Sequence, residues 1–147
     1  MVVRLQQAAF DFGAEANTFA AGRRDAGAIV TFTGITRDLN RGGLDRMEIE
    51  HYPGMTERAL QAIESEARAR WALADCLIIH RFGTMAPGDP IMMVATAARH
   101  RAEAFAAAEF LMDYLKSRAP FWKKEVTATG ESWVESQDTD EAALKRW

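Results

Sequence analysis

The stretch HRAEAFAAAEFLMDYLKSRAPFWKKEVTATGESWVE, residues 100–135, carries two kinds of periodicity on either side of a proline. Before Pro120, apolar residues recur every three or four positions, which predicts an amphipathic helix over residues 101–118. Its apolar stripe consists of Phe105, Ala108, Met112 and Leu115. After the proline, β-branched and aromatic residues predict strands over 121–128 and 131–135, joined by a Thr-Gly turn.

Four further strands are predicted upstream of residue 100, each rich in β-branched or alternating apolar residues. They cover residues 28–33, 47–52, 76–80 and 91–95, and a polar loop over 36–43 separates the first two. With one more helix, the chain reads strand, strand, helix, strand, strand, helix, strand, strand. That order best fits an α+β fold, in which a mostly antiparallel sheet has helices packed on one side.

This other helix is predicted over residues 56–71. Its apolar stripe consists of Leu60, Ile63, Ala67 and Trp71. We expect Thr56 to be the N-cap, with Met55 and Leu60 forming a hydrophobic staple across it. The outer face is expected to carry two i,i+4 ion pairs, Glu64–Arg68 and Glu66–Arg70.

The composition indicates one ordinary globular domain over residues 1–147, with 48% hydrophobic and 27% charged residues and no internal repeat. A chain of this length buries roughly two-thirds of the surface that its unfolded form exposes, so it needs no disulfides. Cys76 is the only cysteine, which excludes an internal disulfide and suits a reducing compartment. The first residues do not resemble a signal peptide, and no apolar stretch approaches the roughly 18 to 20 residues that span a bilayer. We therefore expect a soluble, cytoplasmic protein.

Charge is distributed unevenly along the chain, although the formal net charge is only −3. Residues 99–124 hold six basic and three acidic side chains, whereas residues 125–147 hold six acidic and two basic ones. Nucleic-acid-binding domains usually carry a strong basic excess, so the acidic total argues against that class. A local basic stretch in an acidic protein instead indicates a site for a small anionic ligand.

The sequence lacks the motifs of several common enzyme classes. Its histidines, His51, His80 and His100, do not show the close spacing of a helical zinc motif, and one cysteine cannot supply a thiolate site. There is no Gly-x-Ser-x-Gly elbow and no phosphate-binding glycine-rich loop that opens a helix. We therefore expect no metal site, no resident cofactor and no nucleotide-hydrolysing machinery.

Two lysines in the basic stretch are candidates for proton transfer or covalent chemistry. At about 100° per residue, Lys116 lies within roughly 20° of Phe105, so it belongs to the apolar stripe. It is either a terminal lysine that snorkels past the core edge or a partly desolvated amine beside a pocket. Strand alternation places Lys123 and Lys124 on opposite faces, so only one of them faces the helix-side pocket. The alternative for Lys123 is an edge-strand lysine that blocks aggregation.

Three further cations lie at positions suited to an anion. His100 and Arg101 open the second helix, where backbone N–H groups and the helix dipole favour negative charge. Arg37 ends the segment 32–37. Each cation alone is more often a solvated surface charge, but together they indicate an anionic small ligand.

Five segments of the chain are distinctive when taken together, namely FTG with Arg37 at 32–37, HYPGM at 51–55, HRFG at 80–83, HR with Phe105 at 100–105, and KSRAPFWKKE at 116–125. Together they resemble the large, catalytic subunit of molybdopterin synthase. The similarity runs in order from about residue 27 to residue 147. Its most specific part is the run in which Pro-Phe-Trp lies between two lysines.

The resemblance implies an α/β hammerhead fold and an enzyme that inserts sulfur during molybdenum cofactor biosynthesis. In that family a small ubiquitin-like carrier subunit brings sulfur as a C-terminal Gly-Gly thiocarboxylate. Two transfers convert cyclic pyranopterin monophosphate into the dithiolene molybdopterin. The large subunit forms a homodimer, and one carrier at each end completes a heterotetramer. This chain ends in Lys-Arg-Trp, so we expect it to be the enzyme and not the carrier.

The resemblance also implies roles for individual residues. Lys116 and Lys123 match the catalytic lysines, with Lys116 close to the incoming carrier terminus. Arg37, His100 and Arg101 match residues that hold the phosphate and pterin of the substrate, some of them across the dimer. The other substrate-binding residues predicted, including the pocket wall, are Phe32, Ile35, Thr36, Met112, Lys124 and Glu125.

One position departs from the family pattern. Some relatives carry a basic residue after Trp-Val-Glu-x, where this chain has Gln137. If that residue contacts the anion, its loss leaves one charge-assisted hydrogen bond unmade, at a cost of roughly 1.5 to 3 kcal/mol. We expect activity to survive this loss.

A hypothesis from a different class is a non-catalytic binding module that uses a basic face for an acidic partner or single-stranded nucleic acid. Trp122 beside Lys123 and Lys124 supports it, because aromatic side chains between cations can stack on bases. It predicts salt-sensitive nucleic-acid binding and tolerance of Lys116→Ala. The acidic total and the short basic tract argue against it.

Overall fold

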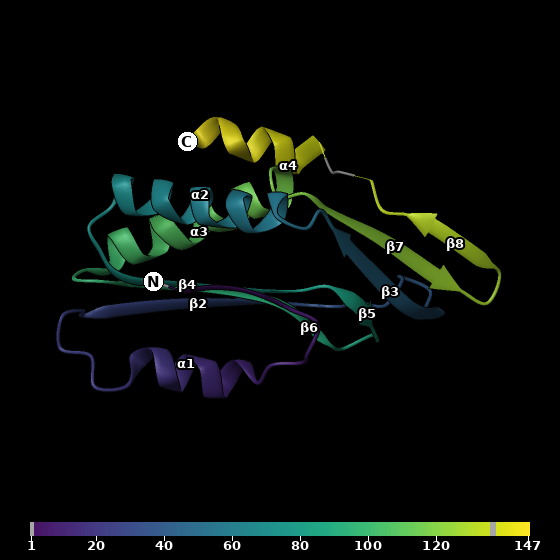
Figure 1. The fold of residues 1–147 in the computed structure, drawn as a ribbon, viewed down its shortest axis with the longest axis horizontal. Coiled ribbons are helices and arrows are strands. Elements are labelled where there is room, and N and C mark those ends of the chain that lie inside the picture. The colour runs from purple at the N-terminus through teal and green to yellow at the C-terminus, as the bar shows by residue number, and fades with distance from the viewer. Residues whose placement is uncertain (1, 136–137) are drawn as a thin grey trace.

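The computed structural model describes residues 2–135 and 138–147, and its strands form two four-stranded sheets (Figure 1). The first sheet, in order β1-β4-β6-β2, consists of β1 (Val2–Gln6), β4 (Leu73–Arg81), β6 (Pro90–Ala98) and β2 (Ala28–Ile35). The second, in order β5-β3-β7-β8, consists of β5 (Gly83–Met85), β3 (Leu44–His51), β7 (Phe121–Thr127) and β8 (Gly130–Trp133). The helical elements described are α1 (Phe12–Ala20), α2 (Met55–Arg70), α3 (Arg101–Ser117), α4 (Asp138–Ala143) and the 3-10 helix η1 (Leu144–Arg146).

The arrangement of these elements confirms the predicted α+β class. Neighbouring strands pair antiparallel in both sheets, apart from β1, which runs parallel to β4. α2 and α3 cover one face of the first sheet, and the second sheet extends beyond one end of it (Figure 1). None of the helices described is long and apolar enough to cross a membrane.

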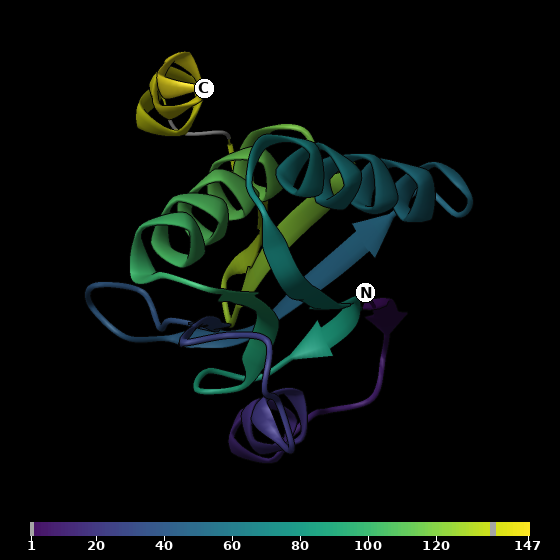
Figure 2. The ribbon, with the colours of Figure 1, turned by 90° about the vertical axis from the view of Figure 1, so that its left-hand side faces the viewer.

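Helices lie on both sides of the first sheet, whereas the sequence predicted them on one side. Figure 2 shows α1 on the face opposite α2 and α3. α1 is nine residues long, and its N-cap is Asp11, whose side chain accepts a hydrogen bond from the amide of Ala14 at 3.0 Å. Only Phe19 in α1 is fully buried, so this short helix has almost no apolar periodicity to reveal it.

The core consists of two apolar clusters separated by the first sheet. Along β4, Cys76 and Ile78 belong to the cluster under α2 and α3, whereas Leu77 and Ile79 belong to the cluster around Phe19 of α1. This alternation follows from the strand period of two. The continuous apolar run in β4 and β6 therefore reflects strands buried on both faces.

The start of α2 differs from the prediction. Gly54, with φ of 82°, is the N-cap, and Thr56 lies inside the helix, fully buried. The Thr56 hydroxyl donates to the carbonyl of Tyr52 at 2.8 Å and accepts from the Tyr52 amide at 3.1 Å. The Thr56 hydroxyl therefore stabilises the turn that begins at Tyr52 and does not cap the helix. Met55 is 51% exposed, so the predicted staple is also wrong.

Two side chains predicted on one face of a helix lie on the other. Glu64 pairs with Arg68 as predicted, but it is fully buried and not on the solvated face. Phe105, predicted in the apolar stripe of the second helix, is 61% exposed. The buried face of α3 is centred on its alanines, because they allow the helix to approach the sheet closely; its buried residues are Ala104, Ala107, Ala108, Phe110, Leu111 and Leu115.

Candidate active site

A cavity of about 810 Å³ lies where the end of α3 and the strand β2 meet the second sheet. Residues from β2, the loop after it, β6, α3, β7 and the segment after β8 line it. Its apolar wall includes Phe32, Ile35, Met92, Met112, Leu115 and Phe121. Its charged side chains include Arg37, Lys116, Lys123, Glu125, Glu135 and Asp140.

Both predicted catalytic lysines line this cavity. Lys116 comes from the last turn of α3, and Lys123 comes from β7. Burial lowers the pKa of Lys123 to about 8, and repulsion from the Lys116 ammonium acts in the same direction, while Asp140 opposes it. No hydrogen bond or ion pair joins either amine to another residue that the structure describes. A lysine that titrates near neutral pH can both give and accept a proton.

Strand alternation separates the neighbouring lysines of β7, as the sequence predicts. Lys123 faces the cavity, whereas the amine of Lys124 lies 3.2 Å from Glu48 and 3.3 Å from Glu131. The Lys124 amine also lies 5.5 Å from the ring centroid of Trp133. Because Lys124 is paired with carboxylates outside the cavity, the basic stretch does not form one continuous face for a polyanion.

His80, which the sequence did not mark as a site residue, also lines the cavity and is only 4% exposed. Its Nδ1 lies 2.8 Å from the carbonyl oxygen of Arg81. Its ring stacks on Phe121 with centroids 3.7 Å apart and planes 13° apart. Burial lowers the pKa of His80 to about 3, despite the hydrogen bond to Arg81. A histidine at the end of an apolar strand carries no sequence signal that separates a buried role from a site role.

Most of the predicted substrate-binding residues are brought together here. Those that line the cavity are Phe32, Ile35, Arg37, Met112 and Glu125. Thr36 lies between two of them but is itself buried, and its amide donates to the carbonyl of Asp89 at 2.8 Å. Its hydroxyl has no partner among the residues described. Thr36 therefore fixes the start of the loop that carries Arg37, without facing the cavity.

His100 and Arg101 lie away from this cavity. They are exposed at the start of α3, whereas Lys116 lies at its end. Fifteen residues of α-helix at 1.5 Å each separate Arg101 from Lys116 by about 22 Å. One chain therefore does not bring these two cations to one small ligand. Position 137, where some relatives carry a basic residue, lies outside the described residues.

The cavity combines an apolar wall with two amines and a guanidinium. The apolar wall suits a flat organic group, and the cations suit an anionic one. Two lysine amines in one cavity can also stabilise developing negative charge and transfer protons. These features suit an enzyme site for a small anionic substrate on an α+β scaffold.

The comparisons with known proteins agree with this class. The family model described as "MoaE protein" matches residues 5–118. A "Molybdopterin synthase catalytic subunit" from Cereibacter sphaeroides is 70% identical over 147 residues, covering 100% of both chains. The structure of a "Molybdopterin biosynthesis MoaE protein from Burkholderia ambifaria MC40-6" is 51% identical with a TM-score of 0.84, covering 99% of this chain and 97% of that one.

A further solved structure shares the fold alone. It is a "Protein-protein complex of subunit 1 and 2 of Molybdopterin-converting factor from Helicobacter pylori 26695", at 18% identity. Its TM-score is 0.78, over 93% of this chain and 92% of that one. The chain belongs to the MoaE protein family, the family of molybdopterin synthase catalytic subunits. It is thus an enzyme subunit of molybdenum cofactor biosynthesis, as the sequence motifs implied.

Proposed function

We propose that this chain transfers sulfur from a thiocarboxylated carrier subunit to cyclic pyranopterin monophosphate, and that the chemistry takes place in the cavity between Lys116 and Lys123. The observation that carries the proposal is the pairing of two amines without partners among the described residues in one cavity, one of them with a pKa lowered to about 8. The apolar wall provides a surface for the pterin ring.

The two lysines take different roles because their surroundings differ. Lys116 is exposed at the end of α3, which suits a group that meets an incoming chain terminus. There its ammonium positions the thiocarboxylate and stabilises charge on the acyl carbon. Lys123 is more buried and titrates close to neutral pH, which suits a general acid or base as the cyclic phosphate opens.

The phosphate site is completed by a second copy of the chain. Arg37 lies in the cavity, but His100 and Arg101 lie at the far end of α3. In a two-fold dimer that packs α3 and β2 of both copies together, the start of one α3 comes near the end of the other. Exposed apolar side chains on these two elements support this interface, namely Ile29, Phe32 and Phe105.

The carrier binds where its C-terminal segment can enter the cavity beside Lys116. The partner is a small ubiquitin-like protein ending in a Gly-Gly thiocarboxylate, and one carrier for each chain of the dimer makes a heterotetramer. We propose a cytoplasmic location, because the chain belongs to a family of enzymes of cofactor biosynthesis. The whole chain, residues 1–147, acts as one domain.

Reconstitution tests the assignment directly. The purified protein is mixed with thiocarboxylated carrier and cyclic pyranopterin monophosphate under reducing conditions, and dithiolene is measured. We expect product with the natural chain and, since its charge stabilisation is lost, a fall of at least about a hundredfold with Lys116→Ala. The variant is expected to be at least as stable to heat as the natural chain, because Lys116 makes no hydrogen bond or ion pair with the described residues and its charge repels that of Lys123.

Lys145→Ala is the matched control, because Lys145 is exposed on η1 and lies outside the cavity. It is expected to keep full activity. An absence of dithiolene with the natural chain would overturn the proposed function. Full activity of Lys116→Ala would instead return Lys116 to the role of a snorkelling lysine at a helix end.

A further inference from the structure

His80 supplies an uncharged polar atom to the inner wall of the cavity. Its ring stacks on Phe121, and in the strand pairing it lies opposite Met92 of β6. The ring is held in place from two sides, by the stack on Phe121 at 3.7 Å and by the 2.8 Å contact between Nδ1 and the Arg81 carbonyl. A buried imidazole fixed this firmly presents one defined edge to the cavity.

The contact with Arg81 decides which edge that is. A carbonyl oxygen only accepts hydrogen bonds, so Nδ1 of His80 carries the hydrogen and Nε2 is left with a lone pair. Nε2 has no hydrogen bond to any residue described. The wall of the cavity therefore offers a hydrogen-bond acceptor that carries no charge.

Lys123 is the described donor best placed to use this acceptor. Phe121, which the His80 ring covers, and Lys123 are two residues apart on β7 and so point to the same face. The Lys123 amine has no partner among the described residues, and a partly buried ammonium without an acceptor is costly. The two groups are not hydrogen-bonded in this structure, but the flexible Lys123 side chain can turn its amine towards Nε2. We infer that His80 is a positioning residue for Lys123, which accepts a hydrogen bond from that amine through Nε2 and thereby holds it at the reacting end of the cavity.

A neutral acceptor suits this role better than a carboxylate. A carboxylate would stabilise the ammonium strongly and keep Lys123 protonated, whereas an imidazole orients the amine and leaves its proton available. The inference rests on the proposed function, since it concerns the amine placed there in proton transfer. The other charged groups that line the cavity with Lys123 are Arg37, Asp38, Lys116, Glu125, Glu135 and Asp140. The ring centroid of His51 lies 6.5 Å from that of Phe121.

The test compares three substitutions of His80. His80→Phe keeps a ring for the stack on Phe121 and removes both nitrogens. His80→Gln places an amide oxygen near the position of Nε2, whereas His80→Asn reaches only the position of Nδ1. Lys123 is titrated by NMR in protein with isotope-labelled lysine, and kcat and KM are measured for dithiolene formation with thiocarboxylated carrier.

We expect Lys123 to titrate at a lower pH in His80→Phe than in the natural chain, because its ammonium loses an acceptor. We expect kcat to fall about tenfold, which is the value of one hydrogen bond, with the KM for the carrier unchanged. His80→Gln is expected to restore both quantities in large part, and His80→Asn is not.

An unchanged Lys123 titration and unchanged kcat in His80→Phe would overturn the inference. Equal Lys123 titration and equal kcat in His80→Gln and His80→Asn would also overturn it, because the His80 ring would then serve packing alone. This comparison remains informative even if His80→Phe does not fold. The NMR titration needs no turnover. A natural chain that makes no dithiolene but shows the expected titration differences would therefore refute the proposed function and leave the inference in place.

Discussion

At the scale of the residue, the catalytic role proposed for Lys123 comes with a cost in stability. The folded chain holds its amine where burial and Lys116 both disfavour the charge, so its pKa falls from 10.5 to about 8. Below pH 8 the folded state must still protonate this amine, whereas the unfolded state does so without penalty. Lys123 therefore destabilises the protein at neutral pH, as residues at functional sites commonly do.

We expect Lys123→Met to stabilise the protein at pH 7 by up to about 3 kcal/mol while abolishing dithiolene formation. Between pH 8 and 10.5 the unfolded natural chain binds more protons than the folded one, so the free energy of unfolding rises with pH. Urea denaturation at pH 7 and pH 10 measures this rise. The methionine variant should show less of it, and a variant less stable than the natural chain at pH 7 would contradict the expectation.

At the scale of the element, the sequence pattern predicted the helices and strands that have a regular apolar period and missed those that lack one. Leu60, Ile63 and Ala67 recur on one face of α2, and all three are buried as predicted. β5 was not predicted, because a three-residue strand that starts with a glycine and leads into a proline-containing turn has the sequence features of a loop. Phe105 was misplaced because periodicity identifies an apolar stripe without showing whether this chain or a second copy covers it.

Some residues of the candidate site could likewise be predicted from the sequence and others could not. Lys116 and Lys123 could be found from sequence, because an ionisable residue on an apolar stripe or in a specific motif is conspicuous. His80 could not, because its role depends on the carbonyl of Arg81 and the ring of Phe121. Arg81 is its neighbour in the sequence, whereas Phe121 is distant in the sequence and is brought near only by the fold. Contacts between distant segments are decided by topology and not by local pattern.

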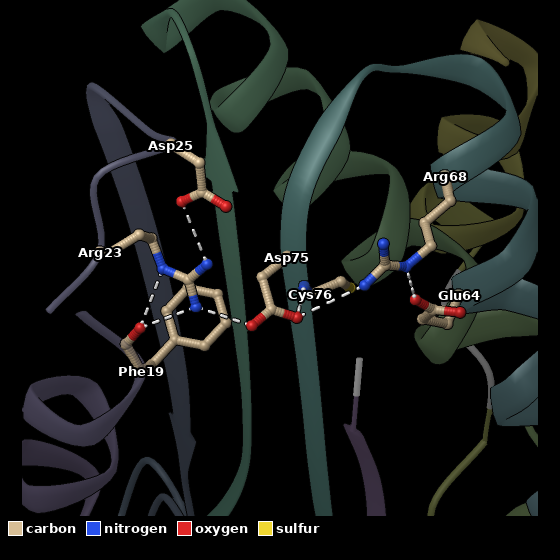
Figure 3. Close-up of polar contacts among 7 residues, drawn as sticks. All are labelled: Phe19, Arg23, Asp25, Glu64, Arg68, Asp75 and Cys76. Atoms are coloured by element: carbon tan, nitrogen blue, oxygen red, sulfur yellow. Dashed lines mark hydrogen bonds and ion pairs between the residues drawn. The ribbon is translucent and has the colours of Figure 1, made fainter. Parts of the chain in front are cut away.

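The N-terminal elements are fastened to the rest of the fold by a charged network (Figure 3). Asp75 at the start of β4 accepts a hydrogen bond from Arg23 at 2.7 Å, and Arg68 of α2 lies 3.4 Å from its other oxygen. Arg23 also donates to the carbonyl of Phe19 at the end of α1. Burial acts to raise the pKa of Asp75, but the hydrogen bonds from Arg23 and the Cys76 amide outweigh it, so the pKa is lowered.

We expect Asp75→Asn to lower the free energy of unfolding at pH 7 by about 1 to 3 kcal/mol, because Arg23 and Arg68 lose a charged acceptor. A carboxylate with a lowered pKa contributes stability above its unfolded pKa and loses it as the pH falls, so the difference should shrink near pH 3. Urea denaturation at both pH values measures it. Asp45→Asn, at an exposed pair with Arg46, is the control and should cost under about 1 kcal/mol.

A loss for Asp75→Asn that equals the control, or that stays constant between pH 7 and pH 3, would contradict this account. The network would then be a set of contacts without net effect on stability, as is common for exposed ion pairs.

At the scale of the whole molecule, the C-terminal segment helps to place charge at the cavity. The ring of Trp147 packs edge-on against Trp71 and Phe110, and its Nε1 donates to Asp113 at 2.6 Å. This anchoring to α2 and α3 holds α4, whose Asp140 lines the cavity and acts to raise the pKa of Lys123. Asp140 in the acidic tail therefore partly offsets the lowering of the Lys123 pKa by burial and Lys116.

The 22 Å between Arg101 and Lys116 leads to a test with mixed dimers. If each cavity takes Lys116 from one copy and Arg101 from the other, Arg101→Ala and Lys116→Ala dimers are each defective in both cavities. After subunit exchange between the two variants, half of the dimers carry one cavity with both defects and one with none. We therefore expect the mixture to recover about a quarter of the natural rate of dithiolene formation.

The matched control mixes Lys116→Ala with Lys123→Met. Both residues line the cavity of a single chain, so every dimer in this mixture retains a defect in each cavity. No recovery is expected there, because exchange cannot assemble an intact site. If the first mixture also recovers nothing while Arg101→Ala alone is impaired, Arg101 does not act across the dimer. If Arg101→Ala alone keeps the natural rate, Arg101 is not part of the phosphate site, and Arg37 anchors the anion without it.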